Sequence, residues 1–209
     1  MNILQIITPS KIAGAGVAIA TDTLAPAVNP AAIVFTTDQI DLGASLFNPN
    51  RSYIVTGQPS GLPGTFGLAP GKVNSGSRLF AVPGFGFTRK AGAHGAFGIA
   101  LYGNGGMNTD YDAAPFGAAP AGVDLSQMFI APTYARTFGG QHAIGVTGIV
   151  AYQRFAAKGL QAFARFSADG ESLTNNAHSH SFGGGLRVGY LATPSRYLSI
   201  GASYQSRIW

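Results

Sequence analysis

The sequence predicts an all-β protein, an antiparallel up-and-down transmembrane β-barrel, because of three observations. Seven segments alternate apolar residues with small or polar residues at a period of two, as strands between two different environments do. Charged residues make up only 10% of the 209 residues, against about 25% in a typical soluble domain. Short and long connections alternate, as in a meander with its turns on one side of a membrane and its loops on the other.

The first part of the chain, residues 1–37, is predicted to be an N-terminal plug, and residues 38–209 are predicted to carry the strands. Residues 12–37 contain Ala- and Gly-rich turns, and their DTLAPA run predicts one helical turn capped by Asp22 or Thr23. An Asn-Pro turn signal follows. These features are typical of a compact plug rather than of a strand.

The seven predicted strands share one pattern, which HAIGVTGIVAYQ illustrates: Ile144 and Val146 take one face, and Gly145 and Thr147 the other. The other six are QIDLGASLF (39–47), RLFAVPGFGFT (78–88), AFGIALYGN (96–104), QMFIAPTYAR (127–136), SFGGGLRVGYLA (181–192) and YLSIGASYQSRIW (197–209). A soluble sandwich or lipocalin-like barrel also alternates. Its second face would carry Lys, Glu and Asp, whereas here that face is mostly Gly, Ala and Ser, which favours a lipid-facing and a lumen-facing side.

The connections and the facing of the last two strands follow from this pattern. KAGAHG, FGGQ and TPSR are short turns, and residues 50–75, 107–124 and 157–180 are long, polar loops. On the outer, lipid-facing side we expect Leu186, Val188, Tyr190, Leu198, Ile200 and Tyr204. On the inner side we expect Arg187, Ser199, Ser203 and Gln205.

The composition excludes several function classes. The chain has no cysteine, so disulfides and thiolate chemistry are excluded. Its net charge is +5, but the cations are scattered, so we expect no nucleic-acid partner. The pair His178 and His180 lacks a third metal ligand, and Asp110 and Asp112 are too few for calcium. No GxSxG motif is present, which argues against an outer-membrane phospholipase. We expect no catalytic residue, metal or cofactor. The start, MNILQIITPSK, lacks a complete export signal.

Several motifs occur in the order of a known family: GAGVAIATDTLAPAVNPAAIVF, QIDLGASLFNPNRSY, ALYGNGGMNTDY, AGVDLSQMFIAPTYAR, AYQRFAAKGL and LTNNAHSHSFGGGLRVGYL. The chain resembles, over almost its whole length, the FadL/TodX family of bacterial outer-membrane transporters for long-chain fatty acids and aromatic hydrocarbons. The resemblance implies a fourteen-stranded barrel in the outer membrane, closed by an N-terminal hatch. Hydrophobic compounds would diffuse passively through it and leave sideways through the wall, in contact with outer-membrane lipid.

Seven strands are half of the number that the family barrel needs. We therefore expect this chain to be roughly the N-terminal half of a transporter that is monomeric when full length. Its strands should form an open, curved sheet, with the strands near Leu42 and Ile200 as unpaired edges. The alternative is a small structural or adhesion barrel of eight strands, and an outer-membrane enzyme is a third possibility.

The resemblance also implies functional residues in the hatch and in the third strand. The family's hatch motif falls on Asn29, Pro30 and Ala31, although an Asn-Pro pair also makes a plain turn. The strand kink at the family's lateral opening falls on Gly103, Asn104, Gly105 and Gly106, where glycines let a strand bulge. A strand that simply runs into a loop is the alternative there. We expect the hatch motif to lie near this third strand.

The predicted substrate-binding residues belong to the long loop after the fifth strand. Leu160, Phe163 and Phe166 recur there at roughly helical spacing, and exposed aromatics of this kind mark a ligand or membrane surface. A loop that packs on itself is the alternative. Arg154 precedes the loop and is a candidate partner for a fatty-acid carboxylate, although its strand parity points it outward.

Overall fold

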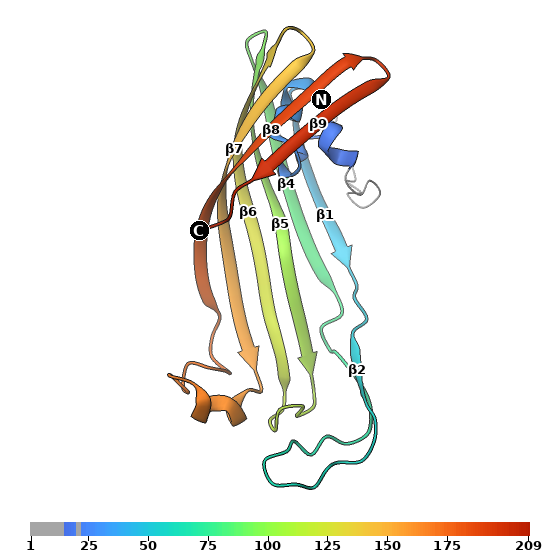
Figure 1. Ribbon diagram of the computed structural model, residues 1–209, viewed down its shortest axis with the longest axis vertical. Coiled ribbons are helices and arrows are strands. Elements are labelled where there is room, and N and C mark those ends of the chain that lie inside the picture. The colour runs from blue at the N-terminus through green and yellow to red at the C-terminus, as the bar shows by residue number, and fades with distance from the viewer. Residues whose placement is uncertain (1–14, 20–21) are drawn as a thin grey trace.

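The computed structural model describes residues 15–19 and 22–209. Its main feature is one antiparallel sheet of seven strands that neighbour one another in chain order (Figure 1). The strands are β1 (Gln39–Phe47), β4 (Phe80–Ala91), β5 (Gly95–Tyr111), β6 (Ala121–Phe138), β7 (His142–Lys158), β8 (Ser179–Ser195) and β9 (Leu198–Gln205). A separate hairpin pairs β2 (Ser52–Val55) with β3 (Gly71–Asn74). No helix within the described residues is long and apolar enough to cross a bilayer.

The all-β antiparallel prediction is confirmed, and the sheet is open. Its two edges are β1, which carries Leu42, and β9, which carries Ile200. Within the described part of the chain these edges do not pair with each other. The described residues therefore do not form the eight-stranded closed barrel of the alternative prediction.

The two faces of the sheet differ as the period-two pattern predicts. We name the inner face as the one that the N-terminal segment (residues 15–19 and 22–38) contacts, and the outer face as the opposite one. On β7, Ile144 and Val146 are exposed on the outer face, whereas Gly145 and Thr147 are buried on the inner face. On β8, Val188 is 45% exposed, while its neighbour Arg187 is only 8% exposed. Contact of the outer face with lipid stays a prediction.

The long connections contain more strand than their sequence predicts. β5 runs on to Tyr111 and β6 begins at Ala121, so much of the predicted loop 107–124 is strand. The predicted loop 50–75 contains the β2–β3 hairpin. A strand of polar residues can continue as long as the neighbouring strand offers backbone hydrogen bonds. Here β5 and β6 remain paired as far as Tyr111 and Ala121.

The core lies between the N-terminal segment and the turn end of the sheet. This segment contains the short 3-10 helices η2 (Ala15–Ala18), η3 (Ala25–Ala27) and η4 (Pro30–Phe35), and η4 contacts β5, β6, β7 and β8. Ile33 of η4 is completely buried, in a cluster that includes Leu191 and several alanines of the sheet. Small residues on the inner face allow the helix to lie almost on the strand backbones.

Candidate functional site

Asn29 and Pro30 fix the start of η4 against two neighbouring strands. Asn29 is the N-cap residue, and its Oδ1 accepts a hydrogen bond from the backbone N–H of Ala31 at 3.0 Å. Pro30 occupies the first turn, where its missing N–H costs nothing. The Asn29 Nδ2 group donates to the carbonyls of Val17 at 2.7 Å and Tyr190 at 2.9 Å. The buried carboxamide is thus fully satisfied and joins η2, η4 and β8.

Two glycines create the space for this motif. A Cβ at Gly189 on β8 would overlap Asn29 Oδ1, and a Cβ at Gly145 on β7 would overlap the backbone of Pro30. The motif itself therefore lies against Gly145 and Gly189 on β7 and β8. The helix that it begins, η4, also contacts the third strand of the sheet, β5. Close approach of backbones needs glycine on both strands, whereas Gly103 faces the side chain of Val82.

Two further contacts hold the N-terminal segment. Thr23 is buried, and its backbone N–H and hydroxyl both donate to Asp41 Oδ2 on β1, at 3.0 and 2.8 Å. On the opposite side, the Arg187 guanidinium donates to the carbonyl of Pro26 at 2.7 Å, to the Tyr102 hydroxyl at 3.3 Å and to Gln205. Arg187 thereby links the segment to β5 and β9.

The pairing between β4 and β5 stops halfway along β5. The two strands pair from Ala91–Gly95 to Gly84–Tyr102, and beyond Tyr102 strand β5 pairs only with β6. Immediately after this point, the β5–β6 register shifts between Gly103 and Gly105. The bulge bends β5 away from β4, so the backbone groups of Gly103–Gly106 on that side have no ladder partner.

The break closes again toward the loops. The Gly76 N–H donates to the Asp110 carbonyl at 2.6 Å, and the Asp110 N–H donates to Ser75 Oγ at 3.0 Å. The Ser77 hydroxyl donates to Asn108 Oδ1 at 2.7 Å. The break is therefore a window in the sheet, bounded by the pair Gly84–Tyr102 at one end and by these contacts at the other.

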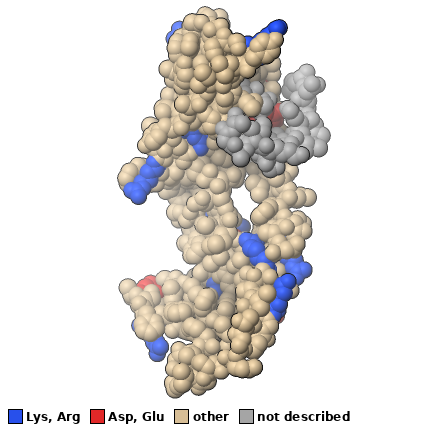
Figure 2. Space-filling model, turned by 45° about the vertical axis from the view of Figure 1, so that its right-hand side comes forward, with Lys and Arg blue, Asp and Glu red and all other residues tan. Residues whose placement is uncertain are grey.

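A cleft of about 840 Å³ occupies this window. It is lined mainly by apolar and small residues: Phe47, Leu79, Val82, Gly103, Gly105, Met107, Leu125 and Met128. Arg154 also lines it, on the outer face as its parity predicts, with its guanidinium 3.5 Å from Asp124 Oδ2. Figure 2 shows the molecule hollowed at mid-height, with Lys and Arg side chains near the hollow. The structure thus brings Arg154 together with Gly103–Gly106 in the lining of one cleft.

The loop end holds a cluster of three phenylalanines, which we name the loop cluster. Phe163 lies on η5 (Gln161–Phe166), and its ring centroid is 5.6 Å from Phe66 and 5.9 Å from Phe116. Phe66 and Phe116 come from two other loops and were missed by the sequence analysis. Their spacing along the chain has no periodicity. The one signal in the sequence is that each is an isolated aromatic residue in a Gly- and Pro-rich loop.

The other two predicted loop residues, Phe166 and Leu160, make different contacts. Phe166 is 73% exposed and carries the Arg165 guanidinium over its ring at 4.6 Å. Leu160 is half-buried, and its N–H donates to Thr174 Oγ1 at 3.2 Å. Hydrogen bonds from Ser172 hold the pKa of Asp169 below its ordinary value. The same hydrogen bonds fix the loop just after η5.

The histidines are engaged separately. His178 Nε2 is 2.7 Å from Asp124 Oδ2, and His180 Nδ1 is 2.7 Å from the Tyr152 hydroxyl. Among the residues that the structure describes, no three His, Cys, Asp or Glu side chains gather at one metal position. Within the described residues, the arrangement combines a largely apolar cleft between β4 and β5 with a cluster of aromatic side chains in the loops.

Comparison with known proteins gives matches to one family and one fold. The sequence model of a family described as outer membrane protein transport protein (OMPP1/FadL/TodX) matches residues 8–209. The structure is similar to a Pseudomonas aeruginosa FadL homologue, with a TM-score of 0.61 and 17% identity over 92% of this chain and 49% of that chain. It is also similar to the CymD monoaromatic hydrocarbon channel, with a TM-score of 0.60 and 11% identity over 93% of this chain and 50% of that one. This chain therefore spans about half the length of these solved structures. No curated protein matches it.

Proposed function

The chain belongs to the outer membrane protein transport protein family (OMPP1/FadL/TodX), and on this premise we propose that it takes part in passive transport of hydrophobic compounds across the outer membrane. The cargo would be long-chain fatty acids or aromatic hydrocarbons, and it would leave sideways through the window between β4 and β5. The observation that carries this proposal is the window itself. It is bounded at both ends by hydrogen bonds and lined largely by apolar residues.

The physical problem is that a hydrophobic solute crosses a polar surface layer slowly, so a protein can help by offering a continuous apolar path. The exposed loop cluster of Phe66, Phe116 and Phe163 would receive the solute. Met107, Leu125 and Phe155 are cross-strand neighbours on the inner face and continue the path from the loops to the window. The cargo undergoes no covalent chemistry on this path.

The N-terminal segment would keep the path closed to other solutes. It covers the inner face at the turn end, where Asn29 and Thr23 are fixed by buried hydrogen bonds. Arg187 joins Pro26 of this segment to Tyr102, the last residue of β5 that pairs with β4. The rim of the window and the segment are thus connected by one side chain. A hydrocarbon cargo has a precedent in a structural neighbour, a monoaromatic hydrocarbon channel.

The test is uptake by the full-length protein in a porin-depleted host, with labelled fatty acid and labelled toluene measured in parallel. In Gly103→Val, the new side chain would meet Val82 Cγ1, which is already 2.7 Å from the position of a Cβ, and would fill the window. We expect uptake of the favoured cargo to fall several-fold. The matched control is Gly148→Val on the outer face of β7, where the nearest atom is 3.9 Å away. Equal uptake by both variants and the parent would rule out the window as the exit.

A further inference from the structure

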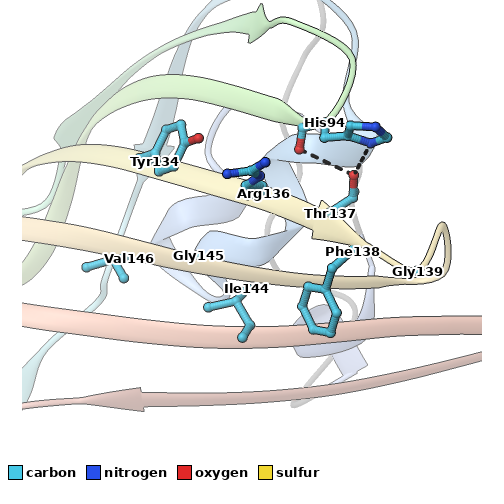
Figure 3. A pocket seen from close by; sticks show the side chains of 9 residues that line it. All are labelled: His94, Tyr134, Arg136, Thr137, Phe138, Gly139, Ile144, Gly145 and Val146. Carbon is cyan, nitrogen blue, oxygen red and sulfur yellow. Dashed lines mark hydrogen bonds between the residues drawn. The ribbon is translucent and has the colours of Figure 1, made fainter.

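A second cavity lies on the outer face, near the turns that join β4 to β5 and β6 to β7. It has a volume of about 620 Å³ and is lined by Tyr134, Arg136, Thr137, Ile144 and Val146, with His94 from the β4–β5 turn (Figure 3). It is remote from the window, which lies beyond Tyr102 on the loop side of β5. The proposed transport path does not use it.

The cavity is polar toward the turns and apolar toward the middle of the strands. At the turn end, the Thr137 N–H donates to the His94 carbonyl at 2.7 Å, and the Thr137 hydroxyl lies 3.4 Å from His94 Nδ1. Tyr134 and Val146 lie toward the middle of the strands, and Figure 3 shows Arg136 between them and Thr137. A phospholipid beside a barrel has this polarity, with its headgroup at the interface and its acyl chains toward the bilayer centre.

Arg136 has no counter-charge among the described residues. Its side chain is exposed on the outer face, and within residues 15–19 and 22–209 its guanidinium makes no hydrogen bond, ion pair or ring contact. It stands two residues before β6 ends at Phe138, which is about 7 Å along the strand. A lipid-facing Arg is costly at the bilayer midplane but tolerated near the interface. At the membrane interface the anionic group available to an arginine is a lipid phosphate, which a guanidinium binds with two parallel hydrogen bonds.

The surrounding rings support an interfacial position for Arg136. Phe97 and Tyr134 pack at 4.8 Å between centroids, and Phe138 stacks on His142 at 5.5 Å. His142 Nδ1 in turn forms a hydrogen bond of 2.6 Å with the Tyr190 hydroxyl. Aromatic side chains gather at the two interfaces of transmembrane barrels. This group would form the girdle on the turn side.

We propose that this cavity binds an anionic phospholipid, with its phosphodiester on Arg136 and one acyl chain along Ile144 and Val146. The inference rests on the proposed membrane location, but not on the transport path. It assigns to Arg136 a role in holding the turn end of the sheet at a fixed depth in the leaflet.

The experiment is native mass spectrometry of the full-length protein, exchanged into equal amounts of phosphatidylglycerol and phosphatidylcholine with the same acyl chains. The parent should retain phosphatidylglycerol in preference. In Arg136→Gln this preference should fall about 10-fold, the usual effect of losing a hydrogen bond to a charged group. The matched control is Arg196→Gln, which removes a cation from the β8–β9 turn, where it stacks on Tyr197 at 4.6 Å. This control should keep the preference.

The proposal would be overturned by no preference in the parent, by an unchanged preference in Arg136→Gln, or by an equal loss in Arg196→Gln. Glycerol phosphate, which has the phosphate without acyl chains, should not displace the lipid at equal concentration; if it does, the cavity is a simple anion site. Circular dichroism verifies that the variants are folded. Uptake by Arg136→Gln should equal that of the parent, so loss of lipid preference and failure of the transport proposal are seen separately.

Discussion

Gly189 is the position where one methyl group should release the N-terminal segment. In Gly189→Ala the new Cβ would overlap Asn29 Oδ1 and lie 2.7 Å from Pro30 Cδ. An ordinary contact begins at 3.4 Å, so the start of η4 must retreat by at least about 0.7 Å. The hydrogen bond from Asn29 Nδ2 to the Tyr190 carbonyl would then lengthen from 2.9 Å to about 3.6 Å, where it no longer counts as one.

The cost follows from the burial of this carboxamide. Asn29 is completely buried, so each polar group that loses its partner costs about 1–3 kcal/mol. Displacement of Asn29 would weaken its hydrogen bonds to the carbonyls of both Val17 and Tyr190. We expect the free energy of opening the segment to fall by about 3 kcal/mol. That corresponds to an increase of about 100-fold in the open population.

Hydrogen–deuterium exchange of the peptide that covers residues 29–36 measures this opening, because Ala32 and Thr36 donate their amides within η4. Exchange there should be about 100-fold faster in Gly189→Ala, while β7 stays protected. The control is Gly184→Ala on the same strand, where the nearest atom to a new Cβ is 3.9 Å away. Equal exchange in the two variants would show that the Asn29–Gly189 contact does not hold the segment.

Two other predictions concern the outer face and the loops. A lysine at Val188, which we expect near the bilayer midplane, should lower the free energy of unfolding in bilayers by about 2–4 kcal/mol, whereas a lysine at Ser199 should have little effect. Equal urea midpoints in vesicles would contradict a lipid-facing Val188. Phe163→Ala removes the ring that contacts both Phe66 and Phe116 and should weaken binding of a labelled fatty acid by about 3–10-fold. Phe166→Ala serves as its control, since Phe166 lies outside the loop cluster, and equal Kd values for the two variants would argue against that cluster as the receiving surface.

The sequence was sufficient for the order and facing of the seven sheet strands, though not for their full lengths, because a strand's side chains alternate over neighbouring residues. Ile144 and Gly145 reveal their opposite faces within a few positions of the chain. The glycine run at 103–106 likewise marked the place where β5 changes register. The role of this run in release stays a prediction.

Only the tertiary structure decided which distant segments meet. Asn29 meets Tyr190 across 161 positions, and Phe66 and Phe163 come together from separate loops. The extent of the window depends on the hydrogen bond from the Gly76 N–H to the Asp110 carbonyl. No local sequence pattern predicts this contact. Such contacts form because buried polar groups must find partners and close approach needs glycine on the opposite strand. Those conditions are set by three-dimensional neighbours, which the order of residues along one strand does not specify.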